Sequence, residues 1–147
     1  MGSRKKLSKA KGRGRQFTPG ELHEQALSLY REGRMKDALE KLGAALKAEE
    51  NSERWNDWGA VQHALGSAQS AEAGFRKALE LDKNNQEAAA NLGALLVELG
   101  RYVEAAPFLV VALNTTNEAQ RAAVEKLIAQ ISQAANAKEA AASAPKE

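Results

Sequence analysis

The chain has 147 residues, of which 44% are hydrophobic, 27% charged and 5% aromatic, and its formal net charge is +2. This length fits one compact domain with disordered ends and excludes two catalytic domains. The absence of cysteine excludes disulfides and thiol nucleophiles, and two histidines leave little material for metal or acid-base chemistry.

The small net charge conceals a strongly basic N-terminus. Residues 1–20 hold seven basic side chains and no acidic one, whereas the rest of the chain holds 14 basic and 19 acidic side chains. The seven cations are Arg4, Lys5, Lys6, Lys9, Lys11, Arg13 and Arg15. Because these cations repel one another and few apolar side chains accompany them, we expect residues 1–17 to form a disordered basic arm.

The first helix is predicted to begin at Pro19. Thr18 is a suitable N-cap, proline fits the first helical position, and Glu21 completes a capping box. Phe17 and Leu22 occupy the two positions of a hydrophobic staple.

A period of 33 to 34 residues organises the central part of the chain. Each of Gly33, Gly66 and Gly100 is expected to end a helix in the left-handed conformation. Small and bulky residues recur in the same register, namely Ala26/Gly59/Gly93, Ala38/Ala71/Ala105, Ala45/Ala78/Ala112 and Leu42/Phe75/Leu109. The period therefore predicts units of two amphipathic helices that pack closely where the small residues lie.

These units resemble tetratricopeptide repeats. The second unit is similar to the family motif nearly throughout, in Trp55-Asn-Asp-Trp-Gly59, Gly66, Ala71, Phe75 and Ala78. The third unit, from Asn91-Leu-Gly93 to Ala112, resembles it almost as well, and the first is weaker. The resemblance implies an all-α fold in which helix-turn-helix repeats stack in a right-handed superhelical solenoid.

The implied repeats occupy residues 18–51, 52–85 and 86–117. A further helix over 118–134, with Thr115 and Glu118 as a possible capping box, is expected to cap the third repeat. The Ala-rich tail over 135–147 is expected to be disordered. Pro107 falls inside the second helix of the third repeat, so we expect this helix to begin late or to bend.

The sequence holds no motif for phosphate binding, zinc catalysis or acyl transfer, so we expect no enzyme, no cofactor and no metal ion. His23 and His63 are interpreted as solvated histidines on polar helix surfaces, with a role as partner contacts or as a pH-sensitive pair as the alternative. Trp55 and Trp58 match large core residues of the motif and are expected to pack in the core.

The resemblance also implies a concave groove, lined by the first helix of each repeat, that binds peptides. The groove positions carried over from the family are His23, Glu24, Leu27, Tyr30, Arg31, Glu53, Asn56, Asp57, Ala60, His63, Glu87, Asn91, Ala94, Val97 and Glu98. Acidic residues outnumber the single arginine, so the groove is predicted to hold a basic or neutral segment of a partner protein. The expected function is that of a non-enzymatic scaffold or adaptor.

Chaperone-binding members of the family hold a terminal carboxylate in a clamp of Lys, Asn and Arg side chains. The five corresponding places here hold His23, Leu27, Asp57, Glu87 and Asn91. Because two of these places hold carboxylates and none holds a lysine or arginine, we expect the groove not to bind acidic C-terminal chaperone tails.

An alternative function lies in the basic arm, whose cations suit the phosphates of nucleic acid or an anionic membrane. A third possibility is that the arm shields the acidic groove until a partner displaces it. We expect a monomer or weak homo-oligomer. A cytoplasmic location is expected because the sequence lacks a signal peptide and any apolar run long enough to span a membrane.

Overall fold

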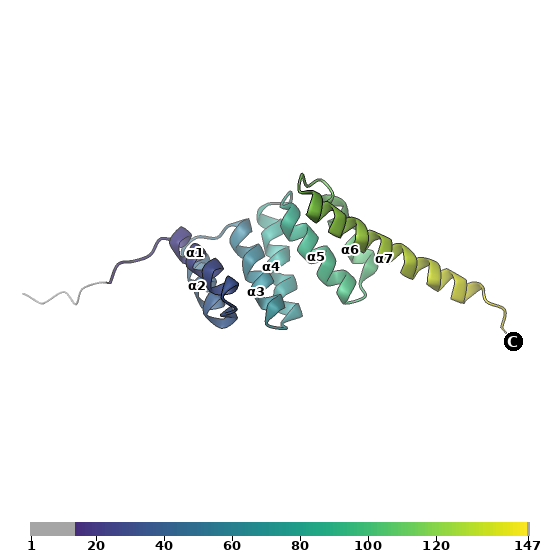
Figure 1. The fold of residues 1–147 in the computed structure, drawn as a ribbon, viewed down its shortest axis with the longest axis horizontal. Helices are drawn as coiled ribbons and strands as arrows, with labels where there is room; N and C mark the ends of the chain where they lie inside the picture. Colours follow the sequence, from purple (N-terminus) through teal and green to yellow (C-terminus); the bar gives the residue numbers. More distant parts are fainter. Residues whose placement is uncertain (1–13, 147) are drawn as a thin grey trace, which may run out of the picture.

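The computed structural model describes residues 14–146, which form seven helices and no strand. The helices are α1 (Pro19–Arg31), α2 (Met35–Ala48), α3 (Ser52–Ala64), α4 (Ala68–Leu81), α5 (Gln86–Glu98), α6 (Tyr102–Ala112) and α7 (Glu118–Ser143). The first six helices form three antiparallel pairs that stack along the long axis of the molecule, and α7 packs on α5 and α6 (Figure 1). The prediction of an all-α helical-repeat solenoid is confirmed.

Side-chain caps fix where the first helix of each pair begins. Thr18 Oγ1 accepts a hydrogen bond from Glu21 N at 3.1 Å, and the Glu21 carboxylate accepts one from Thr18 N at 2.8 Å. The capping box predicted for α1 is therefore present. Asn51 and Asn85 cap α3 and α5 in the same way, through their side-chain oxygens.

A glycine with positive φ follows the first helix of each pair. The φ angles are 77°, 82° and 74° at Gly33, Gly66 and Gly100. Side chains with a Cβ rarely adopt this left-handed conformation, which turns the chain back toward the second helix. The predicted glycine caps are confirmed.

The two helices of the second pair approach to backbone contact. A Cβ added at Gly74 of α4 would lie 2.9 Å from Gly59 Cα of α3. The large side chains pack beside this crossing: Phe75 is 2% exposed, and Trp55 and Trp58 form an edge-to-face pair with ring centroids 5.5 Å apart. Trp58 packs against the core of the first pair, in agreement with its predicted structural role.

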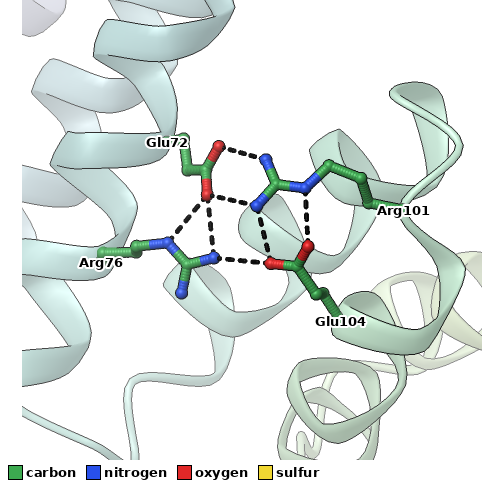
Figure 2. A network of polar contacts seen from close by, with 4 residues as sticks. All are labelled: Glu72, Arg76, Arg101 and Glu104. Carbon is green, nitrogen blue, oxygen red and sulfur yellow. Dashed lines mark hydrogen bonds and ion pairs between the residues drawn. The ribbon is translucent and has the colours of Figure 1, made fainter.

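A network of four charged side chains joins α4 to the start of α6 (Figure 2). Arg101, the residue before α6, donates to both Glu72 and Glu104, with the shortest N–O distance to each being 2.6 Å. Arg76 donates to Glu72 at 2.8 Å and to Glu104 at 3.4 Å. The network therefore fixes the second pair of helices against the third.

The C-terminal helix begins at the predicted residue but differs from the prediction in its cap and in its C-terminal end. Its N-cap is Asn117, whose side chain accepts a hydrogen bond from Gln120 N, in place of the predicted capping box of Thr115 and Glu118. It continues to Ser143 instead of ending at Ala134, so residues 135–143 are helical. Alanine, lysine and glutamate favour helix, and the first helix-breaking residue in this stretch is Pro145.

Pro107 lies within α6, which begins at Tyr102, so of the two expected alternatives the late start is excluded. None of the helices formed by residues 14–146 has the length and apolar character needed to cross a membrane.

Candidate functional site

Two adjoining pockets run across the first helices of the three pairs. The acidic pocket, of about 240 Å³, is lined by Ala26, Leu27, Tyr30, Leu42, Asp57, Ala60, Val61, Glu87 and Asn91. The apolar pocket, also of about 240 Å³, is lined by Tyr30, Ala60, His63, Ala64, Phe75, Asn91, Ala94 and Leu95. Because Tyr30, Ala60 and Asn91 border both pockets, the two form one continuous groove.

Side-chain hydrogen bonds hold the three first helices in register along this groove. One joins α1 to α3 and two join α3 to α5, and their spacing of 34 or 35 residues follows the repeat period. The pairs are His23–Asp57 at 2.6 Å, Asn56–Asn91 at 2.9 Å and His63–Glu98 at 3.0 Å. The groove is therefore built on rigid helices with fixed neighbours.

The interpretation of His23 as a solvated histidine is wrong. His23 is 8% exposed, and its ring N–H donates to the Asp57 carboxylate. This hydrogen bond links α1 to α3. His63 is more open, with 45% of its side chain exposed, and it lines the apolar pocket.

Asp57 is the carboxylate most affected by burial. Removal from water raises its pKa above the ordinary value of 3.8, and the hydrogen bond from His23 opposes this shift. The nearby Glu53 carboxylate raises the pKa further by repulsion. The ionised form of Asp57 is thus less stable than in water, and a positively charged group placed in the pocket would favour it.

The charged side chains that line the acidic pocket are all negative. Asp57 and Glu87 contribute two carboxylates, and no lysine or arginine is among its lining residues in the described part of the chain. Asn91 Nδ2 donates one of its two hydrogens to Asn56 Oδ1, and the amide oxygen of Asn91 can accept a hydrogen bond. The pocket accordingly offers hydrogen-bond acceptors together with the Tyr30 hydroxyl.

The structure brings eight of the fifteen predicted groove residues into the two pockets. They are Leu27, Tyr30, Asp57, Ala60, His63, Glu87, Asn91 and Ala94. Four others, Glu24, Arg31, Glu53 and Glu98, are exposed outside the pocket linings. The remaining three are buried side chains at 8%, 2% and 4% exposure, namely His23, Asn56 and Val97.

The residues at the floor of the groove were not predicted from the sequence. Leu42 of α2 and Phe75 of α4 reach the pockets from the second helices of their pairs. Ala26, Val61, Ala64 and Leu95 complete the apolar lining. The signal that could have found Leu42 and Phe75 was the presence of the small residues Ala26 and Gly59 in the facing helix.

Three atoms able to bind a metal lie near the edge of the groove, on His23, Glu53 and Asp57. These atoms all lie within 4.8 Å of one another. Two carboxylates therefore accompany His23. The hydrogen bond between His23 and Asp57 accounts for their proximity.

Most of the predicted polyanion-binding arm, including Arg4, Lys5, Lys6, Lys9, Lys11 and Arg13, lies outside the described residues. Arg15 is described, and it forms an ion pair with Glu21 at the start of α1. Its guanidinium also lies 5.8 Å from the ring centroid of Phe17, which is 45% exposed.

Comparison with known proteins agrees with the resemblance to tetratricopeptide repeats. The model of the tetratricopeptide repeat family matches residues 62–131. A search of curated proteins gave no significant match.

Solved structures share the fold over most of the chain. The first TPR of Spaghetti (RPAP3), bound to the HSP90 peptide SRMEEVD, has a TM-score of 0.74 at 19% identity and covers 81% of this chain and 94% of its own. The Sgt2 TPR domain from Aspergillus fumigatus has a TM-score of 0.74 at 17% identity, with coverage of 88% and 86%. The Arabidopsis OM64 TPR domain has a TM-score of 0.69 at 25% identity, with coverage of 77% and 96%.

Proposed function

Since this chain is a tetratricopeptide repeat protein, we propose that it is a non-enzymatic scaffold that holds a basic or neutral segment of a partner protein in its acidic groove. The observation that carries the proposal is the acidic pocket, where Asp57 and Glu87 line a cavity bordered by α1, α2, α3 and α5. Rigid helices that present a few polar groups beside apolar walls are suited to binding a peptide.

The charge of the groove in this chain is unsuited to the peptide bound by a structural neighbour. The RPAP3 repeat is bound to a peptide with two glutamates and a terminal aspartate. An acidic peptide placed over Asp57 and Glu87 would meet like charges, each close pair opposing binding by about 1 kcal/mol at an effective dielectric constant near 20 after screening. We therefore propose a partner segment of the opposite charge.

Affinity capture from native extract tests the proposal. The wild type is compared with a double variant, Asp57→Asn/Glu87→Lys, and with a matched control, Glu125→Lys, which reverses an exposed charge on α7. We expect a protein retained by the wild type and the control to be lost by the double variant, while circular dichroism shows that all three remain folded. Equal retention by all three would contradict binding in the groove.

A second candidate function rests on the seven cations among residues 1–20, which are accompanied by no acidic residue. These cations suit nucleic acid or an anionic membrane through contacts with phosphate. The test compares the full chain with a variant beginning at Gln16, using single-stranded RNA and vesicles containing phosphatidylserine. Binding that depends steeply on salt and is lost with the arm would support this function. Equal binding by both forms would contradict it.

A further inference from the structure

We propose that the two pockets read two side chains of one extended segment: a lysine or arginine in the acidic pocket and an apolar residue, two positions away, in the apolar pocket. This inference rests on the proposed function and specifies which segment the groove selects. It is carried by the contrast between two pockets of equal volume that share three lining residues.

The acidic pocket has the two parts that a basic side chain requires. Leu27, Ala60 and Val61 offer apolar walls for the methylene stem of lysine or arginine. Asp57 and Glu87 offer carboxylates for the charged end, and Asn91 offers an amide oxygen. Asp57 is desolvated and lies close to Glu53, so an added cation would relieve both unfavourable interactions.

The size of the pocket favours a single side chain. Its volume of about 240 Å³ is below the roughly 300–1,000 Å³ typical of sites that enclose a whole small-molecule ligand. The pocket is open on one side to the apolar pocket, with Tyr30 and Ala60 on the shared border. A peptide backbone passing over this border can place one side chain in each pocket.

The apolar pocket has a different chemistry. Phe75, Ala94 and Leu95 line it, and no carboxylate is among its lining residues in the part of the chain that the structure describes. Burial of an apolar side chain against these residues removes apolar surface from water, which favours binding. The pocket therefore selects a residue such as leucine or methionine.

The spacing follows from the geometry of an extended chain. Side chains at positions i and i+2 point to the same side and lie about 6.6 Å apart. This distance suits neighbouring pockets with a common border. The expected motif is thus a basic residue, any residue and an apolar residue, in either chain direction.

Selection from a phage library of random twelve-residue peptides, on the full chain, provides the probe. The selected peptides are expected to share the basic and apolar pair at the i, i+2 spacing. Synthetic peptides are then titrated into the wild type and into variants Glu87→Gln, Ala94→Leu and Glu125→Gln, the last as a control on α7.

Each variant should affect one position of the peptide. Glu87→Gln should weaken a peptide carrying lysine by about tenfold and leave the matching norleucine peptide unchanged. Ala94→Leu fills the apolar pocket, so it should weaken the leucine peptide by about tenfold and leave the matching alanine peptide unchanged. The control should alter neither affinity.

Two contrary results would have separate meanings. Peptides that lose affinity with Asp57→Asn/Glu87→Lys but show no paired basic and apolar residues would overturn the two-pocket inference and leave the groove as the binding site. Peptides that are insensitive to Asp57→Asn/Glu87→Lys would overturn the proposed function as well.

Discussion

His23 and Asp57 join the first two repeats at the edge of the groove, with His23 Nε2 2.6 Å from Asp57 Oδ2. The imidazole side chain is 10% exposed and the carboxylate side chain 18% exposed. The Asp57 carboxylate therefore has two contacts at once. It accepts a hydrogen bond from His23 of α1, and it borders the acidic pocket. Mutation of His23 and of Asp57 can therefore separate the role of Asp57 in stability from its role in binding.

Removal of His23 should destabilise the fold. His23→Ala deletes the hydrogen-bond donor and leaves the Asp57 carboxylate buried without it, which lowers the free energy of unfolding by about 1–3 kcal/mol. Urea denaturation at pH 7 measures this change, with His63→Ala as the matched control because that side chain is 45% exposed. Equal effects of the two substitutions would contradict a structural role for the His23–Asp57 pair.

Asp57→Asn should behave differently, because asparagine retains an acceptor for His23 and removes the buried charge. The pKa of Asp57 in the folded protein lies above its ordinary value of 3.8. Its contribution to stability is therefore fully present below pH 3.8 and is lost as the pH rises through the raised pKa.

Wild-type protein should accordingly lose stability relative to Asp57→Asn as the pH increases, by about 1 kcal/mol or less. Thermal unfolding at several pH values between 3 and 7 checks the direction of this difference. A wild type that gains stability relative to the variant over that range would contradict the account of Asp57.

Glu72 should show the opposite pH dependence. Hydrogen bonding from Arg101 lowers the pKa of Glu72 below 4.5, with Arg76 adding to the effect. The contribution of Glu72 to stability is present above pH 4.5 and is lost as the pH falls through the lowered pKa.

Glu72→Gln should therefore lower the free energy of unfolding at pH 7 by about 1 kcal/mol or less, a magnitude typical of ion pairs in contact with solvent. The difference should shrink toward zero in strong acid and decrease with added salt. Chemical denaturation at low and neutral pH measures both effects. A difference that persists unchanged in acid would exclude the ion pairs as its cause.

Two glycine substitutions should have opposite effects. Gly74→Ala places a Cβ 2.9 Å from Gly59 Cα, so the backbones of α3 and α4 must separate, at a cost of about 1–3 kcal/mol. At Gly43, within α2, no described atom lies within 4 Å of an added Cβ. Gly43→Ala should stabilise the protein by about 0.5–1 kcal/mol. Thermal unfolding of both variants tests the predicted contrast in sign.

The helices could be predicted from sequence where local chemistry determines them. Thr18 and Glu21 are three residues apart, and their capping box depends on the local backbone alone. Gly33 marks a turn for a similar reason, since its positive φ favours glycine. The absence of bulky residues after Ala134 predicts fraying there, whereas the high helix propensity of this Ala-rich segment extends α7 to Ser143.

The groove was predictable in part, because repeat register places residues on a face without giving their depth. Asp57 and Glu87 were assigned to the groove from the resemblance, and both line the acidic pocket. The repeat register predicts that His23 is solvated, but its burial depends on the tertiary packing around α1. Leu42 was missed because it reaches the pocket from the second helix, past the small side chain of Ala26.

Isothermal titration with two heptapeptides tests the central claim, the sign of the groove, most directly. One is SRMEEVD, the peptide bound by the RPAP3 repeat, and the other is its charge-inverted counterpart SRMKKVK with an amidated C-terminus. We predict that the inverted peptide binds at least about tenfold more tightly, and that Glu87→Gln reduces this preference. Micromolar binding of SRMEEVD, with weaker binding of the inverted peptide, would contradict an acidic groove that selects basic segments.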